Sequence, residues 1–174
     1  MSTRSNAAVV SVGFIKGGAA YNVIPDDLHI GGTARSFRPE VRDLIEARLG
    51  EIARGVAALH GASAEAEYRR NYPPTINHQA ETEFAAEVAA EICGPDQVIR
   101  DVAPSMGAED FSFYQQKVPG LFFWLGTRPR NQTPEEAASN HSPLFYVDES
   151  GLGLGIRAMA RVALDYLRSA APSP

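Results

Sequence analysis

The sequence predicts an α/β protein of 174 residues in two parts. Residues 8–72 show the pattern β-β-α-β, which is typical of an antiparallel sheet with a helix against it. The paired prolines of the segment 72–75 follow, and such pairs form a stiff extended connector. After them, helical patterns alternate with apolar runs in the order α-β-α-β-α. We therefore expect two domains, 1–73 and 74–174.

The first part is predicted to hold two strands, a long helix and a third strand. Residues 8–15 are rich in β-branched side chains, and residues 28–37 alternate loosely up to Arg38-Pro39. Residues 40–59 are predicted to be a helix, because apolar side chains recur every three or four positions. Residues 62–72 alternate between apolar and charged side chains, as in a half-buried strand. The apolar positions of the helix are Val41, Leu44, Ile45, Leu49, Ile52, Val56 and Leu59.

The second part is predicted to alternate helices with strands. A helix over 79–93 carries Phe84, Val88 and Ile92 on one face. The apolar run 120–125 is typical of a strand that is covered on both faces. The other expected elements are a short strand at 97–102, a short helix at 107–116, a polar loop at 126–147 and a closing helix at 148–167.

Composition excludes several classes of function. The formal charge is −5, from 16 basic and 21 acidic residues, so the chain lacks the positive surface that nucleic acid requires. No run of 18 apolar residues exists, so we expect no membrane span. The polar start of the chain leads into a strand rather than a signal sequence, and we expect a cytoplasmic protein. The single cysteine, Cys93, excludes an internal disulfide and is expected to be a buried small residue.

The histidines do not form a metal-binding motif. The chain has four of them, and none stands in an HxxxH, HxH or HExxH pattern. No GxSxG elbow of a serine hydrolase is present either. Three alternate glycines in 151–155 resemble half of a nucleotide fingerprint, but no strand precedes them. We interpret them as small residues that let a helix pack closely.

Two segments carry candidate chemistry. In 104–111, two adjacent carboxylates, Glu109 and Asp110, follow a glycine at an expected helix start. The alternative is that they are acidic residues favoured by the helix dipole. In the long loop 126–147, His141 could bind a metal or transfer a proton, because imidazole titrates near neutral pH. The alternative is an ordinary surface histidine.

Several motifs together resemble the M20 metallopeptidase family. The similarity runs through residues 8–168 and is greatest to the branch of hippurate hydrolases and indole-acetyl-amino-acid hydrolases. The matching segments occur in the family's order. They are 17–26 (GGAAYNVIPD), 32–37 (GTARSF), 68–77 (YRRNYPPTIN), 105–111 (SMGAEDF), 118–120 (VPG) and 141–143 (HSP).

The resemblance implies a fold and a reaction. The fold would be a partial ferredoxin-like α+β lid, followed by the C-terminal α/β part of a zinc-peptidase-like catalytic domain. Family members cleave the amide bond of N-acyl amino acids with a water held between two divalent ions, Zn²⁺ or Mn²⁺, and a glutamate as general base. The small-molecule partner implied is therefore an N-acyl amino acid.

The resemblance also implies roles for particular residues. His141 matches the family's last metal ligand. Arg35 matches a lid residue that grips the substrate carboxylate, and Asn22 matches one that reaches an active site, in related enzymes that of the partner subunit. Gly107 and Glu109 would line the substrate pocket. The alternative for Asn22 is an Asx-type turn ahead of the following proline.

The family's other metal ligands, its general base and its lid histidine lie upstream of the matched region. We therefore assign no catalytic residue, and we expect the metal site to be incomplete. The chain is expected to correspond to the C-terminal portion of such an enzyme and to be inactive alone. It would pair as a homodimer through the lid or associate with an N-terminal half. The alternative is a non-catalytic dimerisation or ligand-binding module, which would pair through the edge of strand 8–15.

Overall fold

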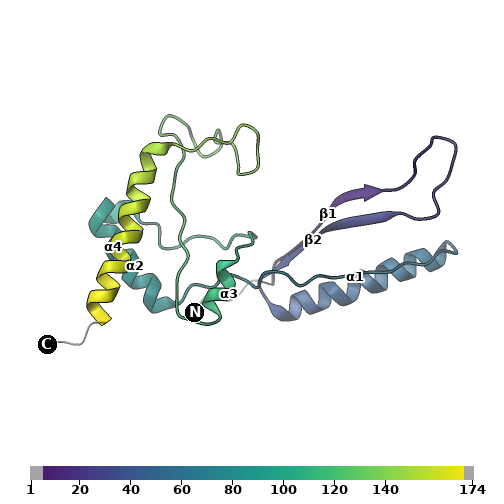
Figure 1. Cartoon of the computed structure of the whole chain (residues 1–174), viewed down its shortest axis with the longest axis horizontal. Coiled ribbons are helices and arrows are strands. Elements are labelled where there is room, and N and C mark those ends of the chain that lie inside the picture. Colours follow the sequence, from purple (N-terminus) through teal and green to yellow (C-terminus); the bar gives the residue numbers. More distant parts are fainter. Residues whose placement is uncertain (1–5, 171–174) are drawn as a thin grey trace. The chain divides into compact units, whose positions relative to one another are not determined.

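The computed structural model describes residues 6–170, and these fall into two units. Unit 1 contains residues 6–75 and 104–113, and unit 2 contains residues 76–103 and 114–170. Figure 1 shows the elements of both: unit 1 has a hairpin and the longest helix of the described residues, and unit 2 has two shorter helices. The architecture is α/β, as the sequence predicts. None of the helices in the described part of the chain is long and apolar enough to span a membrane.

Unit 1 begins with a two-stranded antiparallel sheet. Strand β1 (Ala8–Lys16) pairs with β2 (His29–Ser36), which confirms the two predicted strands. The register shifts between Val12 and Phe14, and β2 has glycines opposite this irregularity. A Cβ on Gly32 would lie 2.0 Å from the carbonyl oxygen of Ser11. Only glycine permits that close approach of the two backbones.

Helix α1 (Pro39–Leu59) follows at the predicted position. Pro39 suits the first turn, where a backbone N–H has no partner within the helix. The helix ends at Leu59, and the chain reverses at Gly61, two residues later, with a φ of +70°. The N–H of Gly61 donates to the carbonyl of Ala58 (3.1 Å), and that of Ala62 donates to the carbonyl of Ala57 (2.9 Å). These bonds satisfy carbonyls that the helix end would leave unpaired.

The three further predicted strands are wrong. Residues 62–72, 97–102 and 120–125 form no strand, because within the described residues the sheet contains β1 and β2 alone. Ion pairs, rather than a ladder of backbone bonds, hold 62–72 to α1. Arg70 pairs with Asp43 at 2.8 Å and with Glu46. An alternating pattern indicates two unlike faces, but it does not supply a partner strand.

Unit 2 is built around helices α2 (Gln79–Cys93) and α4 (Leu152–Ala170). Both were predicted, although a 3₁₀ turn at Glu149–Gly151 precedes α4 and delays its start. The rings of Phe84 and Tyr166 meet edge to face, with centroids 6.0 Å apart. Arg161 reaches Glu91 across the two helices at 3.2 Å. Cys93 is only partly buried at the end of α2, and its Sγ donates to the carbonyl of Ala89.

Of the three glycines in 151–155, Gly155 acts as the sequence predicts. A Cβ on Gly155 would lie 2.8 Å from a methyl group of Leu125, whereas one on Gly153 would meet nothing within 4 Å. Gly155 therefore lets the helix approach the segment 120–125 closely. Close packing, rather than phosphate binding, accounts for this glycine.

Candidate functional site

The candidate residues Gly107 and Glu109 lie in a turn that leads into the short helix α3 (Phe111–Gln115). The helix is shorter than the predicted 107–116, and two hydrogen bonds that involve serine hydroxyls shape the segment before it. Ser112 is 1% exposed, and its hydroxyl donates to the carbonyl of Glu109 at 2.7 Å. The N–H of Gly107 donates to Ser105 Oγ at 3.3 Å. The sequence did not identify Ser112, because a serine that is buried and bonded to the backbone cannot be distinguished by residue type from one on the surface.

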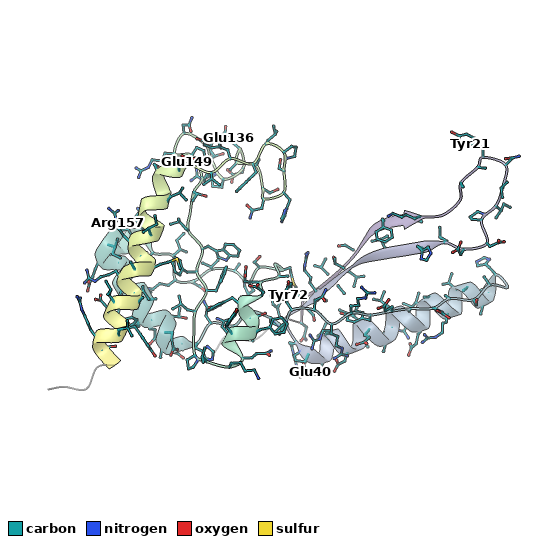
Figure 2. The ribbon with its side chains drawn as sticks, viewed as in Figure 1. Tyr21, Glu40, Tyr72, Glu136, Glu149 and Arg157 are labelled. Atoms are coloured by element: carbon teal, nitrogen blue, oxygen red, sulfur yellow. The ribbon has the colours of Figure 1, made fainter. Side chains whose placement is uncertain are left out.

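Arg35 and Asn22 occupy opposite ends of the hairpin. Arg35 pairs in register with Val9, near the start of β1, whereas Asn22 lies in the loop that follows the other end of that strand. Both side chains are exposed. Within the described part of the chain, neither makes a hydrogen bond or an ion pair, so the Asx-type turn is not formed. The loop also exposes Tyr21, labelled at its tip in Figure 2, and Ile24, which is 92% exposed.

His141 lies in a loop that is closed at its base. The N–H of Asp148 donates to the carbonyl of Thr127 at 2.8 Å, and this bond joins the two ends of 128–147. His141 is exposed and has a φ of +71°. A non-glycine residue rarely adopts this left-handed backbone, and residues held in it cluster at functional sites. The N–H of Ser142 donates to the carbonyl of Ser139 (3.1 Å) and helps to fix the turn.

A hydrogen-bond network that sequence reasoning did not identify positions the segment before this loop. The Asn77 carboxamide bonds to both backbone groups of Phe122: its Oδ1 accepts from the N–H at 2.7 Å, and its Nδ2 donates to the carbonyl at 2.8 Å. It thus behaves like a peptide group of a neighbouring strand. The His78 N–H donates to the Gly120 carbonyl, and the Gly120 N–H donates to His78 Nδ1, both at 3.1 Å. An asparagine just before a helix is, in sequence, indistinguishable from an ordinary cap.

Gln115 completes this network from the end of α3. Its side chain is almost fully buried, with 7% of the residue exposed. The Nε2 group donates to Asn77 Oδ1 at 3.0 Å and to the Gly120 carbonyl at 3.3 Å. The Oε1 atom accepts from the N–H of Ile76 at 3.1 Å. Three of its hydrogen-bonding positions are therefore used, which fixes the orientation of the amide.

Asp148 joins the base of the loop to helix α4. Its Oδ1 accepts from the N–H of Ser150 at 3.0 Å and caps the 3₁₀ turn that starts the helix. Hydrogen bonding from Ser150, through its side chain and then its backbone, lowers the pKa of Asp148. Position and pKa both indicate a carboxylate that stabilises the start of α4.

The described residues do not fit a divalent metal ion by themselves. They contain no group of three or more His, Cys, Asp or Glu side chains close enough to share an ion. His141 is exposed, and one imidazole is too few for a protein metal site, which uses at least three protein ligands. The turn containing Gly107 and Glu109 belongs to unit 1, whereas His141 belongs to unit 2. The local geometry alone therefore does not identify a catalytic centre.

Comparison with known proteins indicates the family of the chain, which the local geometry does not. The N-acetylcysteine deacetylase of Bacillus subtilis (strain 168) is 36% identical over 162 residues, which are 93% of this chain and 40% of that protein. The IAA-amino acid hydrolase ILR1-like 4 of Arabidopsis thaliana is 35% identical over 166 residues, which are 93% of this chain and 37% of that protein. The chain therefore spans about two fifths of the length of these relatives.

A solved structure agrees with these relatives. The YXEP protein of Bacillus subtilis, described as a dinuclear metal-binding peptidase from the M20 family, superposes with a TM-score of 0.69 at 36% identity. The match covers 92% of this chain and 42% of that one. Residues 5–165 match the family described as peptidase family M20/M25/M40. Since that match covers nearly the whole sequence, the chain belongs to peptidase family M20/M25/M40.

Proposed function

We propose that this chain forms part of a metal-dependent hydrolase that cleaves the amide bond of N-acyl amino acids. The family match carries the proposal, and the names of two relatives support the substrate class: one is a deacetylase of N-acetylcysteine, the other a hydrolase of IAA-amino acids. In this proposal residues 1–73 correspond to a partial ferredoxin-like lid, and residues 74–174 to the C-terminal part of the catalytic domain. His141 would be one of several ligands to a Zn²⁺ or Mn²⁺ ion.

The role proposed for this chain's own residues is recognition of the substrate. Arg35 is an exposed guanidinium with no ion-pair partner among the described residues, so it is available to a carboxylate. A guanidinium binds a carboxylate through two parallel hydrogen bonds, which gives orientation as well as affinity. Asn22 would contribute a carboxamide from the hairpin loop, and the turn with Gly107 and Glu109 would line the pocket.

The chain alone is predicted to be inactive. The described residues contain no complete metal-ligand set, so the ligands of an active enzyme must come from other residues. The test is to incubate the purified chain with Zn²⁺ or Mn²⁺ and N-acetylcysteine and to measure release of the free amino acid. We expect no turnover above background. Measurable turnover would overturn this part of the proposal.

A hybrid enzyme tests the substrate class. This chain would replace the matched part of the solved Bacillus subtilis relative, and Arg35→Ala would then be compared with the wild-type hybrid. Loss of a charged hydrogen bond costs about 1.5–3 kcal/mol, so we expect KM to rise about 10- to 100-fold. Arg69→Ala is the matched control, since Arg69 is an exposed arginine that is paired with Glu67. An unchanged KM for Arg35→Ala would refute the assigned role.

A second candidate is a non-catalytic dimerisation module. The observation in its favour is that all nine residues of β1 are exposed and that, within residues 6–170, the strand pairs on one side only, with β2. Exposed strand edges are templates for pairing with another chain. Light scattering on the purified chain measures its molar mass and so tests this candidate. The mass of a monomer at every concentration would exclude it.

A further inference from the structure

His141 lies where two consecutive turns of the loop 128–147 meet. In the first turn, the N–H of Ser142 donates to the carbonyl of Ser139 at 3.1 Å. His141 is the third residue of this turn, and its φ of +71° has the sign that a type II turn requires there. Glycine or asparagine is usual at such a position, because a larger side chain crowds the backbone at positive φ. The left-handed backbone of His141 therefore has to be stabilised by its neighbours.

The second turn begins at Ser142 and runs to Phe145. The N–H of Phe145 donates to the carbonyl of Ser142 at 3.0 Å, and Pro143 occupies the second position, where its fixed φ suits a β-turn. The N–H of Leu144 also donates to Ser142 Oγ at 3.2 Å, which forms an ST-turn over the same residues. The N–H, the carbonyl and the hydroxyl oxygen of Ser142 are thus all bonded within the loop.

The loop 128–147 is shaped by bonds between its own residues. Within the described chain, each hydrogen bond made by a residue of this loop joins it to another residue of the loop. The turn before His141 is an example, since the N–H of Thr133 donates to the carboxylate of Glu136, labelled in Figure 2, at 2.8 Å. A single side chain within the loop can therefore decide the backbone conformation of His141.

We propose that Ser142 is a positioning residue for His141. This inference rests on the proposed function, in which the imidazole of His141 belongs to the reactive site. The Ser142 hydroxyl accepts from Leu144 and holds Ser142 at the start of the second turn. The N–H of Ser142 then faces the Ser139 carbonyl and closes the first turn around His141. Since the direction of a side chain follows φ, the same bonds set the direction of the imidazole.

The hydroxyl bond is strong enough to decide the conformation of His141. A side-chain hydrogen bond contributes a free energy of the same order as the cost of one non-glycine residue in the left-handed region. Removal of the hydroxyl leaves that cost without its compensation, so His141 is expected to return in part to negative φ. The proline at 143 is retained in that case, and the second turn keeps its backbone bond.

Nuclear magnetic resonance on the isolated chain tests this without any measurement of catalysis. The amide and α protons of one residue are closer at left-handed φ than at negative φ, so the NOE between these two protons of His141 reports its backbone. Ser142→Ala is expected to reduce this NOE to roughly half or less of its wild-type intensity. An unchanged NOE would overturn the proposal.

Two further variants separate the hydroxyl from a general effect on the loop. Ser139→Ala is the matched control, because Ser139 contributes only its backbone carbonyl to the turn and should keep the wild-type NOE. Ser142→Asn should also keep it, since an asparagine carboxamide accepts the same bond from the residue two positions later. Equal loss of the NOE in Ser139→Ala, or no rescue by Ser142→Asn, would contradict a specific role of the Ser142 hydroxyl.

The hybrid with the solved Bacillus subtilis relative tests the consequence for the reaction. With N-acetylcysteine as substrate, Ser142→Ala is expected to lower kcat roughly fivefold and to leave KM within about twofold, because the imidazole is misdirected while substrate recognition is unchanged. Ser142→Asn should restore kcat. An active hybrid in which Ser142→Ala keeps the full kcat overturns the positioning role. A wild-type hybrid that does not hydrolyse the substrate counts against the proposed function instead, and the NOE of His141 then decides the role of Ser142.

Discussion

The arrangement of segment 120–125 depends most on the side-chain amide of Gln115. Gln115→Ala removes three hydrogen bonds, to Ile76, Asn77 and Gly120, from a side chain that is 7% exposed. Each bond contributes about 1 kcal/mol net, and a donor left without a partner adds to the cost. We therefore expect the free energy of unfolding to fall by about 3–4 kcal/mol.

Fluorescence of Trp124 is a suitable assay. It is the only tryptophan of the chain, and its ring meets that of Phe122 edge to face at 5.2 Å, next to the network. Urea denaturation gives the free energy of unfolding and the slope m for each variant. Gln116→Ala is the matched control, because Gln116 is the adjacent residue and is exposed. If the two variants differ by less than about 0.5 kcal/mol, which is typical of surface substitutions, the network does not hold the segment.

A charge substitution separates hydrogen bonding from packing. Gln115→Glu keeps the shape of the side chain but places a carboxylate oxygen against two acceptors, Asn77 Oδ1 and the Gly120 carbonyl. The ionised form is disfavoured in the folded state, so the pKa of the introduced carboxyl is raised there. The destabilisation is then absent below the unfolded pKa of about 4.3 and is complete above the raised folded pKa. A stability difference from wild type that does not change with pH would contradict this reasoning.

Two other predictions concern helix α4. Gly153→Ala should stabilise the chain by about 0.5–1 kcal/mol, since alanine favours a helix. Gly155→Ala should lose that gain, because its methyl group would clash with Leu125. Equal changes in the melting temperature for the two variants would disprove the close packing. Because the pKa of Asp148 is lowered, its contribution to the start of α4 is present above the unfolded pKa near 3.9 and is lost as the pH falls through the folded value. Circular dichroism between pH 5 and pH 2 should therefore show a loss of helix in the wild type. The helix signal of Asp148→Asn should change less with pH, because asparagine can still accept the capping bond and does not titrate. Identical pH profiles for the two proteins would exclude this role.

The sequence predicted the regular elements where the signal is local. The apolar spacing of residues 40–59 and 79–93 gave helices that agree with α1 and α2 within one residue at each end. The β-branched residues of 8–15 predicted a strand in the same way, and it agrees with β1. The motifs also sufficed to identify the family, because several of them occur in one order, and the family match confirmed this.

Interactions between distant residues could not be predicted in the same way. Residues 120–125 have the composition of a buried strand, but the side chain of Asn77, 45 positions earlier than Phe122, takes the place of a neighbouring strand. Nothing in the local pattern distinguishes such an asparagine from a helix cap. For the candidate site, the sequence assigned His141, Arg35 and Asn22 by resemblance, and their roles stay predictions.

The sequence by itself thus determined the helices, the hairpin and the family, because periodicity and motif order are properties of neighbouring residues. The tertiary structure alone decided which extended segments pair and that buried Gln115 orients Asn77. The physical reason is that strand pairing and burial depend on which residues, distant in sequence, lie against a strand edge or an apolar face. A pattern within one element records only that such a surface exists.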